Sequence, residues 1–172
     1  MERATPLVEV TVGPPGSGKS TYARKRAEEG ALVVNIDAIV TMLHGGNYHR
    51  YNDDYDKIYK AIEFDVVKNV LLAGEDLVFD RCCNKRDTRV RVVRIAKQFG
   101  ATTRAVMFET GSPEQLAERR LESDARGYTK EIWMEVIERR IAETDPVDEE
   151  LEGFDETLVV STLGELVREN NA

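Results

Sequence analysis

The feature that most constrains the fold is a glycine-rich segment near the start of the chain. Residues 13–20 read Gly-Pro-Pro-Gly-Ser-Gly-Lys-Ser, which fits the pattern Gly-x4-Gly-Lys-Ser/Thr. The segment lies between a buried strand predicted over residues 7–12 and a helix predicted over residues 21–29. In this context glycines let backbone N–H groups converge on phosphate oxygens, and the helix N-terminus adds its positive end. The sequence therefore predicts a phosphate-binding loop (P-loop).

Individual positions of the loop have distinct expected roles. Lys19 is expected to reach the β- and γ-phosphates of ATP, and the Ser20 hydroxyl is expected to ligate Mg²⁺. The residues predicted to contact the nucleotide are Gly13, Pro14, Pro15, Gly16, Ser17, Gly18, Lys19, Ser20 and Thr21.

Short apolar strands and amphipathic helices alternate along the rest of the chain. Further strands are predicted over residues 32–35, 77–79, 103–108 and 157–160. Helices are predicted over residues 38–43, 54–73, 87–99 and 130–143, from Ser112 onward, and briefly at the C-terminal end. This alternation predicts an α/β fold with a parallel five-stranded sheet and helices on both faces. No linker or repeat divides residues 1–172, so a single domain is expected.

The net charge of −8 comes from one acidic segment. The chain has 32 acidic and 24 basic residues, and residues 143–156 alone hold eight acids and no base. The remainder, with 24 acids and 24 bases, is formally neutral. The net charge therefore does not exclude a nucleic-acid substrate, although it predicts that binding is local and modest.

Several protein classes are excluded by simple patterns. No apolar run approaches the roughly 18 residues of a membrane helix, so no membrane association is expected. The N-terminus has no signal-peptide pattern, and Cys82 and Cys83 are adjacent, which is no disulfide framework. We therefore expect a cytoplasmic protein in which both cysteines are small buried side chains.

Residues 84–87 read Asn-Lys-Arg-Asp and match a guanine-binding pattern of GTPases. We reject that interpretation because no Asp-x-x-Gly segment lies between the P-loop and this motif. An oligomeric ATPase would need a longer chain with a second subdomain. The short chain favours a small kinase.

Two aspartates follow predicted strands at the edge of the sheet where ligands bind. Asp37 follows the second strand and is our candidate general base, which would orient an acceptor hydroxyl and take its proton. The alternative is that Asp37 caps the helix over residues 38–43. Asp80 ends the third strand and is a candidate to hold Mg²⁺ or its water, the alternative being a satisfied strand-end carboxylate.

Several stretches resemble the polynucleotide-kinase-like P-loop kinases, a family of polynucleotide 5′-hydroxyl kinases that are AAA-like ATP-binding kinases. The resemblance covers roughly residues 7–161. The matching stretches are Gly13–Thr21, Asp37 with Met42-Leu43-His44-Gly45-Gly46, Phe79-Asp80, Glu118-Arg119, Arg126-Gly127, and Glu152-Gly153-Phe154-Asp155-Glu156.

The resemblance implies a fold of the adenylate-kinase type, with ATP and Mg²⁺ as cofactors. It implies transfer of the γ-phosphate to a 5′-hydroxyl of DNA or RNA, with Asp37 at the position of the general base. Arg119, rather than Arg120, and Arg126 fall at positions of arginines that contact ATP phosphates from a helical lid, here approximately residues 112–143.

The chain departs from the family pattern on the acceptor side. Ile36-Asp37-Ala38-Ile39-Val40 stands where the family has Arg-Asp-Asp-x-Arg, so Val40 replaces an arginine that contacts the acceptor phosphate. Asp80-Arg81-Cys82-Cys83-Asn84 stands where the family has Asp-x-Thr-Asn. Phosphoryl transfer is therefore better supported than the identity of the acceptor.

Two segments nevertheless favour a nucleic acid. Residues 81–94 hold six bases and one acid, and could follow phosphates, although they could equally form a solvated helix face. The loop over residues 44–51 mixes aromatic and basic side chains, which either stack on bases or pack between two helices.

The leading hypothesis is an ATP-dependent kinase acting on a nucleic-acid hydroxyl, either a 5′ end or a hydroxymethylated base in DNA. One alternative is a small-molecule kinase acting on a nucleoside, sugar or antibiotic, which would need a closed pocket around Asp37. The other is a nucleotide-gated binding module whose P-loop acts as a switch.

Overall fold

A computed structural model describes residues 5–122, 127–161 and 166–171. The elements follow the predicted alternation, with bounds that differ by one or two residues in most cases. In order they are β1 (Leu7–Val12), α1 (Lys19–Glu28), β2 (Leu32–Val34), α2 (Ile36–Leu43), the 3-10 turns η1 (Tyr48–Arg50) and η2 (Asp53–Tyr55), α3 (Asp56–Ala73), β3 (Leu77–Phe79), α4 (Arg86–Gln98), β4 (Thr102–Phe108), α5 (Pro113–Glu122), α6 (Lys130–Ala142), α7 (Glu149–Glu152), β5 (Glu156–Val160) and β6 (Leu166–Asn171).

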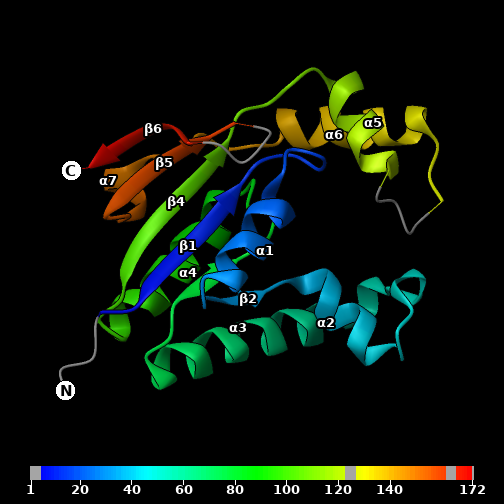
Figure 1. Ribbon diagram of the computed structural model, residues 1–172. Coiled ribbons are helices and arrows are strands. Elements are labelled where there is room, and N and C mark those ends of the chain that lie inside the picture. Colours follow the sequence, from blue (N-terminus) through cyan, green and yellow to red (C-terminus); the bar gives the residue numbers. More distant parts are fainter. Residues whose placement is uncertain (1–4, 123–126, 162–165, 172) are drawn as a thin grey trace.

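The sheet has the strand order β2-β3-β1-β4-β5-β6, and β1 to β5 are parallel (Figure 1). The predicted parallel five-stranded sheet is confirmed. The predicted C-terminal helix is wrong, because residues 166–171 form β6 and pair antiparallel with β5. The exposed edge of β5 offers backbone donors and acceptors, and a short segment without a strong helical pattern gains more hydrogen bonds there than in an isolated helical turn.

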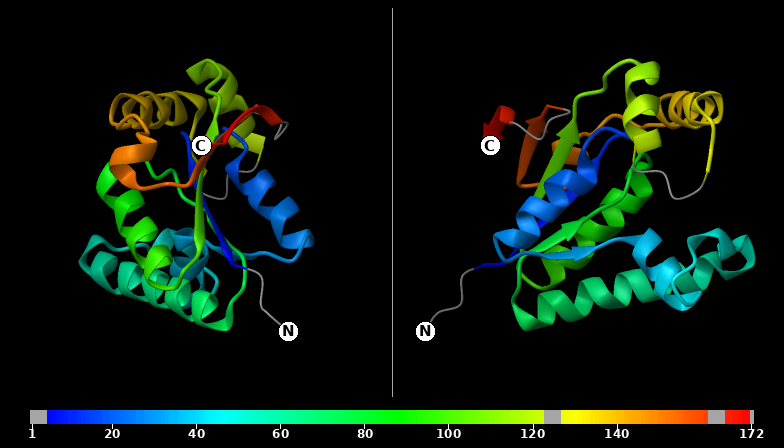
Figure 2. Two further views of the ribbon diagram at one scale, coloured as in Figure 1. Left: turned by 90° about the vertical axis from the view of Figure 1, so that its left-hand side faces the viewer. Right: turned by 45° about the vertical axis from the view of Figure 1, so that its right-hand side comes forward.

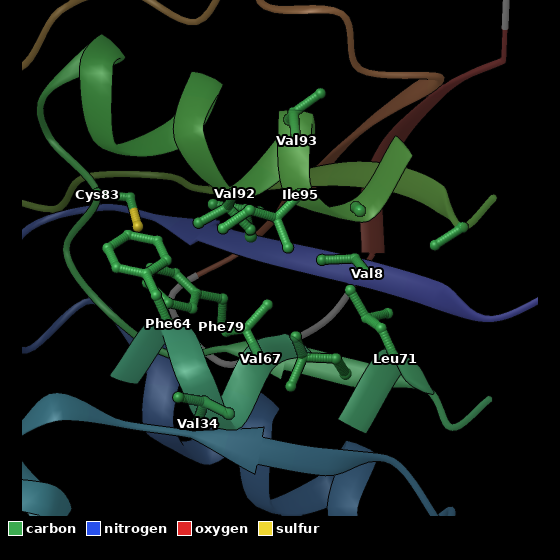
Figure 3. Close-up of a cluster of buried hydrophobic side chains, with 14 of the residues drawn as sticks. Val8, Val34, Phe64, Val67, Leu71, Phe79, Cys83, Val92, Val93 and Ile95 are labelled. Atoms are coloured by element: carbon green, nitrogen blue, oxygen red, sulfur yellow. The ribbon is translucent and has the colours of Figure 1, made fainter. Parts of the chain in front are cut away.

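Helices cover both faces of the sheet, as predicted. In the left view of Figure 2, α1 lies on one side, and α3 and α4 lie on the other. Alternate residues of β1 point to opposite faces, so Val8 and Val10 enter the main core beneath α3 and α4. Figure 3 shows Phe64 and Val67 of α3 facing Val92 of α4 across this core. Burying each such side chain stabilises the fold by about 1.5–3 kcal/mol.

The face under α1 contains a buried carboxylate that the sequence analysis did not single out. Glu9 of β1 is 1% exposed and accepts hydrogen bonds from the Tyr22 hydroxyl at 2.6 Å, Arg26 Nε at 2.6 Å and Arg104 Nη1 at 3.0 Å. Burial and the neighbouring Glu9 carboxylate raise the pKa of Tyr22 above its usual range. These bonds tie α1 to β1 and β4, so both ends of the P-loop are anchored.

The predicted lid region holds two helices, α5 and α6, which pack against each other through Leu116, Ala117, Trp133 and Ile137. In Figure 1 this pair lies at the upper right, and α2 with the loop after it lies at the lower right. None of the helices described is long and apolar enough to span a bilayer.

Candidate active site

The P-loop connects β1 to α1 and requires glycine at specific positions. Gly18 has φ of 101° and is the N-cap of α1, while Gly16 has φ of 80°. A Cβ atom on Gly16 would lie 2.3 Å from the carbonyl oxygen of Leu116 in α5. The loop therefore packs directly against the backbone of the predicted lid, in a conformation that side chains rarely adopt.

Lys19 begins α1, and its side chain folds back over the loop. Its Nζ atom donates hydrogen bonds to the Pro14 carbonyl oxygen at 2.7 Å and to Ser17 Oγ at 3.4 Å. Lys19 is 8% exposed, whereas Ser20 and Thr21 are exposed. The positive charge is thus held at the loop, where phosphate oxygens would be bound.

One cleft of about 1330 Å³ joins the P-loop to the candidate residues predicted from the rest of the sequence. Its lining comes from the P-loop and α1, the ends of β2 and β3, the η1–η2 loop, and α5 and α6. Its lining residues include Gly16, Gly18, Lys19, Ser20, Thr21, Asp37, Tyr48, Tyr51, Asp80, Arg81, Arg119 and Arg120. Within the described chain, sequence-distant candidates therefore share one site.

Asp37 lies in the first turn of α2 and lines the cleft. The cap of this helix is Asn35, whose side-chain oxygen accepts a hydrogen bond from the Ala38 N–H at 3.0 Å. The alternative that Asp37 caps this helix is therefore excluded. Its half-buried carboxylate belongs to a cleft that also contains the P-loop, as a general base would require.

Asp80, at the end of β3, is held in place by Asn35. Asn35 Nδ2 donates to Asp80 Oδ2 at 2.9 Å and to the Asp80 carbonyl oxygen at 3.1 Å. Asp80 is 5% exposed, and its Oδ1 atom makes no hydrogen bond within the described residues. Asn35 thus links the two strand ends that carry the candidate carboxylates, a connection that the sequence analysis missed.

The residues present fit a magnesium ion bound mainly by nucleotide and water. Mg²⁺ keeps several waters and commonly takes one or two protein oxygens together with substrate phosphates. Ser20 offers a hydroxyl, and Asp80 offers a carboxylate oxygen in the same cleft. Among the residues described, no group of three or more His, Cys, Asp or Glu side chains forms a self-sufficient metal site.

Arg119 and Arg120 of α5, in the predicted lid, both line the cleft. The guanidinium carbon of Arg120 lies 4.8 Å from the ring centroid of Trp133 in α6, which gives this side chain a packing role. Arg126, also predicted to contact ATP, lies outside the described residues. Arg140, in the last turn of α6, lines the cleft as well and was not predicted.

The basic segment over residues 81–94 does not form one patch. Arg89 is fully buried, and its Nε and Nη2 atoms donate to the two carboxylate oxygens of Glu152 at 2.6 and 2.7 Å. The guanidinium carbon of Arg91 lies 3.8 Å from the centroid of the Phe64 ring. The helical repeat distributes these side chains around α4, and buried partners hold some of them.

The loop over residues 44–51, called the aromatic loop below, is both packed and exposed to the cleft. Tyr48 and Tyr51 line the cleft and stack with their ring centroids 6.3 Å apart, and Tyr51 also packs against Tyr59 at 5.4 Å. Tyr59 is 1% exposed, and its hydroxyl lies 2.6 Å from His44 Nε2. The loop is therefore packed, as one of the two alternatives predicted, and two of its rings also line the cleft.

The charges that line the cleft are mixed. The basic residues are Lys19, Arg24, Arg81, Arg119, Arg120 and Arg140, and the acidic residues are Asp37, Asp53, Asp56, Asp80 and Glu122. Asp53 and Asp56 follow the aromatic loop in the sequence, and partial burial together with their charges raises the pKa of Tyr51. The near balance of six bases and five acids does not resemble a basic channel for a long polyanion.

The adjacent cysteines differ in environment. Cys83 is buried, and burial raises the pKa of its thiol well above the usual range. Cys82 is half-buried and lines the cleft, and its carbonyl oxygen accepts a hydrogen bond from the Gly13 N–H at 3.1 Å. The expectation of a small buried side chain is thus confirmed for Cys83, while Cys82 is partly open to the cleft.

Comparison with known sequences identifies the family. A family model described as the AAA domain matches residues 8–146, so the chain belongs to this family. No curated protein matches the sequence.

Solved structures with the same fold include several kinases. A candidate kinase from Chloroflexus aurantiacus superposes with a TM-score of 0.68 at 19% identity, covering 94% of this chain and 88% of its own. A fungal RNA kinase superposes with a TM-score of 0.63 at 14% identity, covering 99% of this chain and 80% of its own. A gluconokinase from Sinorhizobium meliloti superposes with a TM-score of 0.57 at 22% identity, covering 93% of this chain and 85% of its own. Family, fold and loop define the chain as a P-loop kinase, an ATP-dependent enzyme.

Proposed function

We propose that this kinase transfers the γ-phosphate of ATP to a 5′-hydroxyl end of DNA or RNA. The observation that carries the proposal is the continuous cleft that joins the P-loop, Asp37 and two tyrosine rings. A phosphate donor, a base for the acceptor hydroxyl and a surface for a nucleobase are thereby available in one site.

The donor side would bind ATP through the loop backbone and Lys19. Ser20 and Asp80 would hold Mg²⁺, which neutralises charge on the phosphates when bound. The position of Lys19 at the loop and the anchoring of Asp80 by Asn35 support these assignments. Thr21, exposed at the start of α1, would contact the phosphates from the helix N-terminus.

On the acceptor side, Asp37 would accept the hydrogen bond of the acceptor hydroxyl. As the acceptor oxygen forms its bond to the γ-phosphorus, the bond from that phosphorus to the oxygen of ADP breaks, and the hydroxyl proton passes to the Asp37 carboxylate. Asp37 is half-buried at the helix start, so its position is set by the backbone of α2.

The pair α5 and α6 would act as the lid. Arg119 lines the same cleft as the P-loop and would stabilise the transferring phosphate, as would Arg126. The packing of Leu116 against Gly16 makes the loop and the lid neighbours in this conformation.

Recognition of the nucleic acid would be confined to its end. The cleft of about 1330 Å³ exceeds the about 300–1,000 Å³ of common small-ligand pockets, so it has room for more than ATP alone. Tyr48 and Tyr51 offer ring faces for a base, worth about 1–3 kcal/mol per stacked base. The mixed charge argues for contact with a terminal nucleotide rather than with a long stretch of backbone.

Asp53 and Asp56 favour a second candidate, a kinase for a small uncharged or cationic molecule. Carboxylates beside the tyrosines would repel additional phosphates and would accept hydrogen bonds from hydroxyl or amino groups of a sugar, nucleoside or antibiotic.

A labelling experiment separates these candidates. The protein is incubated with Mg²⁺ and γ-labelled ATP and offered 5′-hydroxyl oligonucleotides, hydroxymethyl-base DNA, nucleosides, sugars and aminoglycosides. We expect label in the 5′-hydroxyl oligonucleotide. Label that enters small molecules alone would establish the second candidate, and ATP binding without any transfer would indicate a nucleotide-gated switch.

A further inference from the structure

Arg81 lines the cleft just after β3, and its backbone is held by β1. Its backbone N–H donates to Thr11 Oγ1 at 3.1 Å, and its carbonyl oxygen accepts from the same hydroxyl at 2.8 Å. Thr11 is fully buried in β1. The start of the Arg81 side chain is therefore fixed relative to the sheet, one residue beyond Asp80.

The far end of this side chain is held by a buried glutamate. Arg81 Nη1 donates to Glu63 Oε2 at 2.8 Å, and the Glu63 side chain is 0% exposed whereas that of Arg81 is 24% exposed. Burial raises the pKa of Glu63, and the charge of Arg81 opposes this effect. The buried Glu63 carboxylate has few other hydrogen-bond partners. Its bond to Nη1 therefore fixes the orientation of the Arg81 guanidinium group.

The remaining donors of Arg81 are suited to an oxyanion. Glu63 binds Nη1, so the edge of the guanidinium group formed by Nε and Nη2 remains available. Within the described chain neither Nε nor Nη2 makes a hydrogen bond. Two parallel N–H groups on one edge match two oxygens of a phosphate. Arg81 lines the cleft, so a ligand in the cleft can approach this side chain.

The side-chain partner of Arg81 lies on the helix that also packs against the tyrosines of residues 48–51. Glu63 lies one turn after Tyr59 in α3, and Tyr59 packs against Tyr51 of the aromatic loop. Helix α2, which carries Asp37, has no basic residue, and its Val40 is buried in the core at 1% exposed. Arg81, which follows β3, therefore places a cation in the same cleft as Asp37.

We propose that Arg81 binds a phosphate of the acceptor next to the reacting nucleotide, and that Glu63 positions it. This inference rests on the proposed function, and it makes the enzyme select acceptors with a phosphate on the 3′ side of the reacting nucleoside. A bare nucleoside would be a poor substrate, although it presents the same 5′-hydroxyl.

The test compares a nucleoside with its 3′-monophosphate as acceptors for the intact protein. The wild type is expected to show a kcat/KM about 10- to 100-fold higher for the 3′-monophosphate, the effect of one charge-assisted contact. Arg81→Lys retains the ion pair with Glu63 but loses the forked edge, so the preference should fall several-fold, mainly through the acceptor KM. The KM for ATP should not change.

A double variant guards against misfolding, because Arg81→Ala alone would leave Glu63 buried without its partner. Arg81→Gln combined with Glu63→Gln removes both charges and retains two groups that can hydrogen-bond. It should abolish the preference while transfer to the nucleoside persists. Arg94→Gln, on the exposed face of α4, is the matched control and should behave as the wild type.

The outcomes distinguish this inference from the proposed function. A wild type that phosphorylates both acceptors equally overturns the role of Arg81 and leaves the proposed function intact. Loss of kcat with both acceptors in the Arg81 variants also overturns it, because Arg81 would then act on the transferring phosphate. A wild type that phosphorylates no nucleoside, nucleotide or oligonucleotide refutes the proposed function, and the inference with it.

Discussion

The proposed donor and acceptor sides of the cleft are built in different ways. The proposed donor side is one continuous segment, Gly13 to Thr21, which connects β1 to α1 and of which residues 15, 16 and 18–21 line the cleft. The acceptor side combines side chains that are far apart in sequence, among them Asp37, Tyr51 and Arg81. A local backbone site is readily recognised in a sequence, whereas a site made of side chains from several elements depends on tertiary packing. Variants on the two sides should therefore affect different kinetic constants.

A large effect is expected on the donor side, from Lys19→Met. Loss of the ammonium group removes a positive charge from the phosphates and should reduce kcat about 1,000-fold. Single-turnover transfer measures this effect. Lys25→Met, on an exposed position of α1, is the control and should retain the wild-type rate. Equal rates for Lys19→Met and the wild type would show that the loop does not bind the transferring phosphate.

Asp37→Asn should lower kcat about 100-fold through loss of the general base, while ATP binding is unchanged. Calorimetry gives the Kd for ATP, and steady-state transfer gives kcat. Asp65→Asn, an exposed carboxylate of α3, is the control. If Asp37→Asn transferred phosphate at full rate, the acceptor hydroxyl would be activated elsewhere.

Gly16→Ala tests the contact between the loop and the lid. Its Cβ would lie 2.3 Å from the Leu116 carbonyl oxygen, and we expect a loss of about 1–3 kcal/mol in the free energy of unfolding from this contact alone. Gly45→Ala is matched, because Gly45 also has a positive φ, of 65°, but nothing lies within 4 Å of its Cβ position. Equal losses in the two variants, measured by chemical denaturation, would argue against a close approach of α5.

Tyr51→Ala should have the smallest effect and should act only on the acceptor. Loss of a stacking surface is expected to raise the acceptor KM about tenfold and to leave the KM for ATP unchanged. Tyr55→Ala removes a ring of the same aromatic cluster that does not line the cleft, and should leave both constants unchanged. A similar change in both variants would mean that the cluster acts through packing alone.

Short sequence patterns correctly predicted the elements whose conformation depends on residues close in the sequence. The P-loop, the parallel strands and the cleft position of Asp37 follow from short-range patterns and from the rule that parallel strands present ligands at their carboxyl edge. The C-terminal segment was mispredicted because its pairing with β5 is a tertiary contact. The arrangement of the basic segment over residues 81–94 stayed open from the sequence, because Glu152, the partner of the buried Arg89, lies 63 residues away.

The most direct test of the account is to locate the label within a phosphorylated acceptor. Wild-type protein, Mg²⁺ and γ-labelled ATP are incubated with a 5′-hydroxyl oligonucleotide, and the product is digested with a nuclease that releases nucleoside 5′-monophosphates. We predict that the label is recovered in the 5′-monophosphate of the first nucleoside. Label recovered solely as inorganic phosphate, or attached to a base, would contradict transfer to the 5′-hydroxyl.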